Sequence, residues 1–156
     1  MFKINRKTDY SVRVMLALAK RPYGTRLPTK FIEEQTLIPP PFLRRIVADL
    51  SRSGLIHTFP GPNGGLQLAR APHEINLRHI WEAVEGRLLI SDCIEFPEEC
   101  PFDSNCPVRS CWGRLQAVLV KEMESTSLTE LAGEANALIT RTSVQLKNEV
   151  FLNSLK

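Results

Sequence analysis

The chain has 156 residues and a formal net charge of +3, and 43% of its residues are hydrophobic. This apolar content is enough for a folded core, so a fully disordered chain is excluded. The length fits one modest domain, or a small domain with an appendage. No apolar run is long enough to span a membrane and the N-terminus lacks the pattern of a secretory signal, so we expect a cytoplasmic protein with no membrane partner.

The charge is distributed unevenly along the chain. Residues 1–70 contain 12 Lys and Arg against 4 Asp and Glu, whereas residues 71–156 contain 8 against 13. A basic first half joined to an acidic second half indicates that the first half contacts a polyanion and the second has a different role. The alternative is a chance excess of charge on a solvated surface.

Three helical patterns occupy the start of the chain. Residues 8–20 repeat apolar side chains at helical spacing, and Thr8 is the expected N-cap. A short helix is expected over residues 29–35. A third pattern covers residues 38–50 and opens with prolines, which are tolerated in a first helical turn, while Gly54 provides the C-terminal stop.

The second and third of these helices form a helix-turn-helix pattern. Arg44, Arg45 and Arg52 fall largely outside the apolar stripe of the third helix, so its open face is basic. Beyond that helix the period changes to two, because residues 55–59 and 66–70 flank a turn rich in Gly, Pro and Asn. Such a β-hairpin directly behind a helix-turn-helix is the wing of a winged helix.

Further helices are expected over residues 76–85 and 112–124, and Ser127 with Glu130 matches a capping box that opens another. The fold class is therefore mainly α with a small β-hairpin wing. The predicted units are a winged helix-turn-helix domain over residues 1–86, a cysteine-rich loop over 87–111, a helical region over 112–140 and a tail over 141–156.

All four cysteines lie in residues 91–111, a segment that also holds three prolines. In a cytoplasmic protein, clustered cysteines indicate metal or redox chemistry rather than disulfides. Cys93, Cys100, Cys106 and Cys111 are spaced more widely than the close pairs of structural zinc sites. Thiolates spread along a wrapping loop suit an iron–sulfur cluster better, and reduced thiols without a cofactor are the alternative.

The motifs taken together resemble the IscR/NsrR family of winged-helix regulators in the Rrf-two superfamily. The resemblance covers roughly residues 1–133, and its motifs are residues 8–10, 43–50, 54–56, 61–65 and 77–86, then Cys93, Cys100, Cys106, Trp112 and residues 127–131. It implies a homodimer, paired through the long helix over residues 112–124, that binds a pseudo-palindromic operator in double-stranded DNA. It also implies a repressor whose operator affinity is set by a [2Fe–2S] or [4Fe–4S] cluster that senses redox state, nitric oxide or iron and cluster supply.

By the same resemblance, Cys93, Cys100 and Cys106 are three cluster ligands. One subgroup of the family takes its fourth ligand from a histidine, but Arg109 stands at that position here. Another subgroup, which resembles nitric-oxide sensors, uses an aspartate of the partner subunit's N-terminal helix, and Asp9 matches that motif. Cys111 is the other candidate, since a soft thiolate outcompetes a carboxylate for iron where geometry allows.

The expected DNA-contact residues are Lys3, Arg6, Lys7, Pro41, Phe42, Arg44, Arg45, Arg52, His57, Gly61, Asn63 and Gly64. Arg44 and Arg45 can reach a guanine edge or a phosphate. In the related proteins, hydroxyl side chains often stand where this chain has prolines 39–41, and an arginine often stands where it has Pro60. We therefore expect an operator that differs from those of the best-known relatives.

No catalytic pattern is present: the chain has no nucleophile elbow, no triad context and no glycine-rich phosphate loop, so an enzyme is not expected. The other function considered is a cluster-free regulator. In that case the cysteines act as thiol switches or hold zinc, and the acidic half binds a partner enzyme of cysteine or sulfur metabolism.

Overall fold

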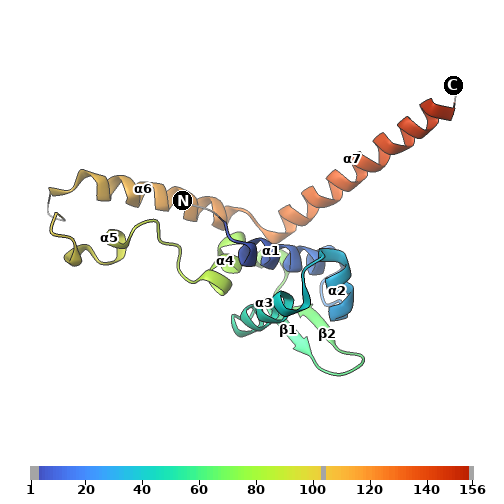
Figure 1. Cartoon of the computed structure of the whole chain (residues 1–156), viewed down its shortest axis with the longest axis horizontal. Coiled ribbons are helices and arrows are strands. Elements are labelled where there is room, and N and C mark those ends of the chain that lie inside the picture. Colours follow the sequence, from blue (N-terminus) through green and yellow to red (C-terminus); the bar gives the residue numbers. More distant parts are fainter. Residues whose placement is uncertain (1–3, 103–104, 155–156) are drawn as a thin grey trace.

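Helices α1, α2 and α3 and a two-stranded hairpin form the N-terminal part of the protein (Figure 1). The computed structural model of the protein describes residues 4–102 and 105–154, with side chains as far as residue 141. The elements in chain order are α1 (Arg6–Ala19), α2 (Thr29–Thr36), α3 (Pro40–Arg52), β1 (Ile56–Phe59), β2 (Gly65–Leu68), η1 (Pro72–Glu74), α4 (Leu77–Glu85), α5 (Asp92–Glu95), η2 (Pro97–Glu99), α6 (Pro107–Ser125) and α7 (Leu128–Ser154).

One apolar core holds the winged helix together. It is built from aliphatic side chains that the helical and strand periodicities place on one face of each element, and its fully buried members include Val14, Met15, Ile32, Leu43, Ile46, Leu50, Leu55, Ile56, Ile75, Ile80 and Leu128. Each such side chain stabilises the fold by roughly 1.5–3 kcal/mol when it is fully buried. Because Leu128 belongs to this core, the start of α7 is anchored to the winged helix.

Helix α1 begins earlier than its apolar pattern predicts. Thr8 is not its N-cap: the side-chain Oδ1 of Asn5 accepts a hydrogen bond from the Thr8 N–H at 3.0 Å, so Asn5 is the cap. The side chain of Thr8 is buried, and its hydroxyl donates to Glu85 Oε1 at 2.7 Å. A buried hydroxyl requires a partner, and α4 supplies it. The prediction that Thr8 is the N-cap was wrong. It depended on where the apolar side chains begin to repeat at helical spacing, and residues 5–7 are polar and lie outside that repeat.

The helix-turn-helix of α2 and α3 confirms the sequence pattern. Helix α2 ends at Leu37, a residue in the left-handed region with φ 54°, whose N–H donates to the Glu33 carbonyl at 2.9 Å. This conformation costs a residue other than glycine roughly 1–2 kcal/mol. Pro39 then forms the N-cap of α3, with prolines in the first turn as predicted. The sharp turn sets the direction in which α3 leaves the core.

The predicted wing is present as an antiparallel hairpin in which Ile56 pairs with Leu68 and Phe59 with Gly65. A third segment joins this sheet, because Leu27 and Leu66 exchange backbone hydrogen bonds of 2.9 and 2.8 Å. Gly65 has φ 151°, and a Cβ atom there would lie 2.2 Å from the Leu27 carbonyl oxygen. The close approach of these two backbones therefore requires glycine.

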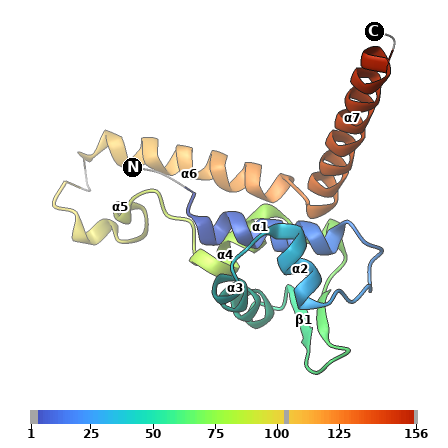
Figure 2. The same cartoon turned by 45° about the vertical axis from the view of Figure 1, so that its right-hand side comes forward.

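The C-terminal elements extend away from the winged helix. Helices α5 and α6 reach to one side of it and α7 to the other (Figures 1 and 2). Helix α6 begins at Pro107 rather than near Trp112, because Cys106 is its N-cap and a proline at the first helical position needs no hydrogen-bond partner. Cys111 consequently lies in a helix and not in the loop. Ser127 Oγ accepts from the Glu130 N–H at 3.1 Å, as the predicted cap requires.

Among the described residues, none of the helices has the length and apolar character needed to cross a membrane.

Candidate DNA-binding surface and cysteine loop

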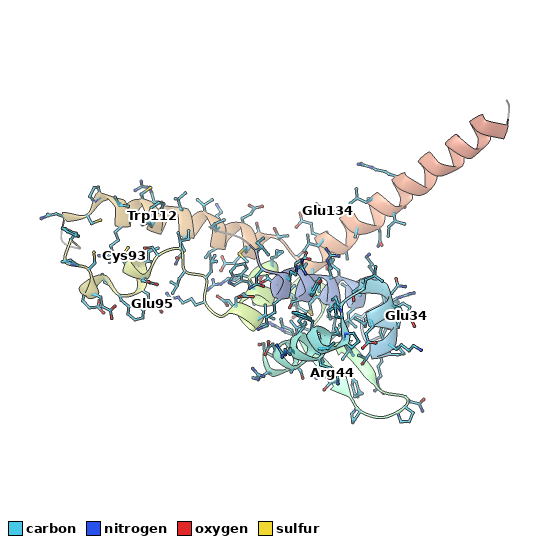
Figure 3. All side chains as sticks on the ribbon, viewed as in Figure 1. Glu34, Arg44, Cys93, Glu95, Trp112 and Glu134 are labelled. Carbon is cyan, nitrogen blue, oxygen red and sulfur yellow. The ribbon has the colours of Figure 1, made fainter. Side chains whose placement is uncertain are left out.

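The outer face of α3 presents two arginines and an aromatic ring. Arg44 and Arg45 are exposed, and Figure 3 shows Arg44 on the side of α3 away from α1. Neither side chain forms an ion pair with the described part of the chain. Phe42 is 46% exposed and packs edge to face against Tyr10, with ring centroids 6.1 Å apart. Its remaining surface is available for an apolar contact such as a thymine methyl group.

The C-terminal end of α3 is tied to α1 and α4. Lys7 Nζ lies 2.8 Å from Asp49 Oδ2 and donates to the Val84 carbonyl at 2.6 Å. Arg52 Nη1 lies 3.2 Å from the other oxygen of Asp49, while its side chain stays 75% exposed. The hydrogen bond from Lys7 is the main reason that the pKa of Asp49 is lowered, against the opposing effect of its burial. Lys7 is therefore engaged within the protein, whereas Arg52 keeps an accessible guanidinium.

The wing lies beside α3 (Figure 1) and carries four of the predicted contact residues, His57, Gly61, Asn63 and Gly64. His57 is exposed on β1, and its ring packs edge to face against Phe59 at 6.5 Å. Gly61 has φ 93°, and a Cβ atom on Gly64 would lie 2.0 Å from the Phe59 carbonyl oxygen, so both glycines are required by the turn. Asn63 is exposed at the tip. Arg6 is exposed at the start of α1, and Lys3 lies outside the described residues.

Arg26 is a residue of this surface that the sequence did not indicate. It precedes Leu27 in the loop between α1 and α2, and its guanidinium carbon lies 3.6 Å from the centre of the Phe59 ring. In the sequence, Arg26 is one of many basic residues in the basic first half of the chain, and nothing distinguishes it from the others. No period or motif indicates that the loop pairs with β2, so the stacking becomes visible only in the fold.

The four cysteines lie around the end of the molecule formed by α5, η2 and the start of α6. All four are free thiols and half-buried. Figure 3 shows Cys93 on α5 and Trp112 on the neighbouring α6 at this end. Cys106 lines an open cavity of about 430 Å³ with Ile94 and Arg109. Within residues 4–102 and 105–141, no three His, Cys, Asp or Glu side chains are close enough together to hold a metal ion.

Hydrogen bonds connect this cysteine loop to the helices on both sides. Arg87 Nη1 lies 2.9 Å from Glu95 Oε1 on α5. The Ile90 N–H donates to Gln116 Oε1 on α6 at 3.1 Å. Arg78 on α4 pairs with Glu82 on its own helix and with Glu124 on α6. The cysteine loop is thus hydrogen-bonded to α6, and α6 is paired with α4.

Asp9, the alternative fourth ligand, lies on α1. Its carboxylate pairs with Arg13, with 3.0 Å between Oδ2 and Nε. It also borders an apolar groove of about 250 Å³ whose walls include Trp81 and Leu119. The structure does not group Asp9 with the described cysteines of its own chain.

An exposed basic helix with a hairpin beside it defines a winged-helix DNA-binding protein. The profile of the Rrf2 family, described as an iron-dependent transcriptional regulator, matches residues 4–134. The chain belongs to this family. An HTH-type transcriptional regulator of Synechocystis sp. is 31% identical over 135 residues, which are 86% of this chain and 90% of that protein.

Two solved structures share the fold. The structure of CymR, the global cysteine regulator of B. subtilis, has a TM-score of 0.67 and 25% identity, and the match covers 86% of this chain and 98% of CymR. The structure of T. potens IscR has a TM-score of 0.68 and 25% identity, with 86% of this chain and 88% of IscR covered. The chain is therefore a transcriptional regulator and not an enzyme.

Proposed function

We propose that this chain is a homodimeric repressor whose affinity for its DNA operator is set by an iron–sulfur cluster bound through Cys93, Cys100 and Cys106. The observation that carries the proposal is that every cysteine of the chain is a free, half-buried thiol within residues 91–111, and that Ile90, just before this segment, is hydrogen-bonded to Gln116 on α6. The family's description as iron-dependent supports it.

DNA recognition is assigned to α3 and the wing. Arg44 and Arg45 can donate to guanine O6 and N7 in the major groove or to phosphates, and Phe42 can contact a thymine methyl group. Pro40 and Pro41 have no N–H to donate, and the Phe42 N–H is bonded to the Pro39 carbonyl at 2.9 Å, so readout is assigned to these three side chains. The exposed side chains of Arg6, Arg52 and His57 are proposed as contacts to the DNA backbone, and the glycines of the wing tip would allow a close approach.

Dimerisation is assigned to α6. Its exposed apolar side chains recur at helical spacing: Val108 is 48% exposed, Trp112 37%, Leu115 46% and Val118 66%. A contiguous apolar stripe of this kind indicates a protein interface. A second copy of α6 would bury it and place two winged helices on a pseudo-palindromic site.

The donor set fits an iron–sulfur cluster in its chemistry. The thiols are reduced, and their spacing along a loop and a helix start is wider than that of a structural zinc knuckle. When bound, the cluster would supply a redox- and nitric-oxide-reactive iron centre. Its binding would draw Cys93 on α5 and Cys106 at the start of α6 toward one centre. Since Ile90, just before α5, is bonded to Gln116 on α6, a shift of α5 would also act on α6.

The fourth ligand is either Cys111 of the same chain or Asp9 of the partner subunit. Cys106 is the N-cap of α6, and Cys111 lies five residues later in the same helix. Somewhat more than one helical turn therefore separates the two residues. Asp9 would have to exchange its pairing with Arg13 for a contact across the dimer. Both remain candidates under this proposal.

The test is the visible absorption spectrum of protein purified without oxygen, with iron and acid-labile sulfide analysis. We expect a brown protein with matched iron and sulfide. Each of Cys93→Ser, Cys100→Ser and Cys106→Ser should abolish the chromophore. Comparison of Cys111→Ser with Asp9→Asn then identifies the fourth ligand, because only the true ligand changes the spectrum. A protein that holds neither iron nor sulfide after reconstitution contradicts the cluster.

A cluster-free regulator is the second candidate, favoured by one observation: the described residues do not gather three metal ligands. This observation favours the form of the regulator in which the thiols respond to oxidation over the form in which they hold zinc, because zinc also needs three or four ligands. In either form, the acidic half binds a partner enzyme of cysteine or sulfur metabolism. The likeness to a global cysteine regulator is consistent with this function. Co-purification of one enzyme in stoichiometric amount, with a colourless protein, would establish it.

A further inference from the structure

The hairpin itself carries little positive charge. Residues 56–68 contain neither Lys nor Arg, and His57 is the basic side chain among them, although they lie beside the helix that carries Arg44 and Arg45. A protein that binds duplex DNA neutralises phosphates with Lys and Arg, and an Arg is also the side chain that a narrow minor groove attracts. An arginine at the wing would therefore have to come from a neighbouring segment.

Arg26 lies against the wing in a defined position. Its guanidinium carbon is 3.6 Å from the centre of the Phe59 ring, within the range of a strong cation–π contact. The Phe59 ring is in turn packed edge to face against His57. The stacked guanidinium uses its flat face for this contact, so the N–H groups along its edge remain able to donate.

The backbone that carries Arg26 is fixed to the hairpin. The next residue, Leu27, exchanges two backbone hydrogen bonds with Leu66 of β2. On the other side, the Gly24 carbonyl accepts from Gln67 Nε2 at 2.9 Å. The loop on both sides of Arg26 thus moves with the wing as one unit.

We propose that Arg26 is the cation of the wing, and that it contacts the DNA alongside the hairpin while Phe59 positions it. The inference rests on the proposed DNA binding and assigns a residue that the helix-turn-helix does not include. The stacking matters because an unrestrained arginine loses rotamer entropy when it binds, whereas a stacked one is already ordered. Its hydrogen-bond acceptors are phosphate oxygens or the minor-groove edges of bases.

The test uses the full-length chain and duplexes that it selects from a random-sequence pool. Arg26→Ala should weaken binding to the selected duplex about tenfold, the effect of losing one arginine contact. Arg21→Ala is the matched control, because Arg21 also stacks on a ring, that of Phe31 at 5.4 Å, but that ring belongs to α2 and not to the wing. The control should change affinity less than about twofold.

The salt dependence identifies the acceptor. If Arg26 contacts a phosphate, Arg26→Ala lowers the slope of log affinity against log salt by about one. If it enters the minor groove, the loss depends on A·T pairs next to the recognised site and vanishes when they are replaced by G·C pairs. Both results support the contact.

Phe59 is tested as a positioning residue by a pair of variants. Phe59→Tyr keeps the ring and should bind as the wild type does, whereas Phe59→Leu keeps an apolar side chain but removes the π face and should weaken binding severalfold. In the Arg26→Ala background, Phe59→Leu should have little further effect, since the two act through one contact. Circular dichroism confirms that each variant is folded.

Two results overturn the inference in distinguishable ways. If the wild type selects a duplex and Arg26→Ala binds it with unchanged affinity and salt slope, Arg26 is not a contact while DNA binding stands. If the wild-type chain, with or without its cofactor, enriches no sequence and retains no duplex, the proposed function fails and the inference fails with it.

Discussion

Lys7 shows how a tertiary contact redirects a basic side chain. Its place in the basic N-terminal segment predicts a phosphate contact, yet its ammonium group is bonded to Asp49 on α3 and to the Val84 carbonyl on α4. One side chain thus joins three helices. A direct phosphate contact by Lys7 stays a prediction, and it would require these bonds to break. In the fold, its contacts hold α3 against α1 and α4.

The Asp49→Asn variant should therefore destabilise the winged helix. The carboxylate is 18% exposed and accepts a charged hydrogen bond, so its loss should cost about 1–2 kcal/mol in urea unfolding at pH 7. The pKa of Asp49 is lowered below its usual value, so folding favours the ionised form. Its contribution is present above the unfolded pKa near 4 and is lost as the pH falls through the lower folded pKa. As the pH is lowered, the free energy of unfolding should therefore fall less in the variant than in the wild type.

A matched control is available on α1. Asp9 pairs with Arg13 at i,i+4, and both side chains are about half exposed. Asp9→Asn in cofactor-free protein should cost less than about 0.5 kcal/mol, as expected for a surface pair. Equal losses for the two variants would show that the Lys7–Asp49 bridge has no special role.

At the scale of elements, the cap of α4 is a reciprocal pair. Asn76 Oδ1 accepts from the His79 N–H at 3.0 Å, and His79 Nδ1 accepts from the Asn76 N–H at 3.2 Å. An imidazole can accept this second bond only when Nδ1 is unprotonated. Burial is the main cause that lowers the pKa of His79, with Arg70 acting in the same direction. The fold therefore selects neutral His79.

Stability should consequently depend on the protonation of this residue. Since the folded pKa is lower than the unfolded value near 6.5, the contribution is complete above that value and is lost as the pH falls through it toward the folded pKa. Thermal unfolding between pH 7.5 and 5.5 should show a falling Tm for the wild type. His79→Gln keeps an acceptor at the capping position, so the Tm of this variant should depend less on pH.

His57→Gln is the comparison variant, because His57 is exposed on β1 and caps no helix. It should retain the wild-type dependence on pH. A flat profile in the wild type, or an equal loss of slope in both variants, would contradict the assignment to His79.

The helices and the hairpin could be predicted because their signals are local. Apolar residues at helical spacing place α2 and α4, the Gly-rich turn places the wing, and Gly86, with φ 82°, ends α4 as its sequence position suggests. The start of α6 could not be predicted from the sequence, because a proline after a cysteine is typical of a loop unless the N-cap geometry is known. Thr8 was misassigned for a similar reason: its partner, Glu85, is remote in sequence and meets it only in the fold.

The candidate sites divide in the same way. Arg44 and Arg45 follow from the period of α3, and the cysteine loop follows from composition alone. Arg26 depends on the pairing of Leu27 with Leu66, a contact between a loop and a strand that no pattern in either segment encodes. A contact between a loop and a strand leaves no shared periodicity in the two segments, so it cannot be predicted from the sequence pattern.

At the scale of the whole molecule, the cysteine loop and α3 are joined by a continuous series of bonds. Gln116 on α6 holds the loop, Glu124 on α6 pairs with Arg78 on α4, and the end of α4 is bonded to α1 through Glu85 and Lys7. A change in the loop that moves α6 would therefore also act on the position of the winged helix. In a dimer it would alter the separation of the two α3 helices.

The dimer is tested by Val118→Glu. Val118 is 66% exposed within the apolar stripe of α6, and a buried carboxylate without a partner would be costly in an interface. Sedimentation at micromolar concentration should show a dimer for the wild type and a monomer for the variant. Affinity for a pseudo-palindromic duplex should fall more than tenfold because the two half-sites are no longer bound by one molecule.

Ala117→Gln serves as the control on the same helix. Ala117 is exposed outside the stripe, and an uncharged side chain there leaves the pairs of Arg78 with Glu82 and Glu124 in place. This variant should sediment as a dimer and bind DNA as the wild type does. If Val118→Glu stays dimeric while both variants are folded, the stripe is not the interface, and the coupling between the cysteine loop and DNA must act within one subunit through Arg78 and Glu124.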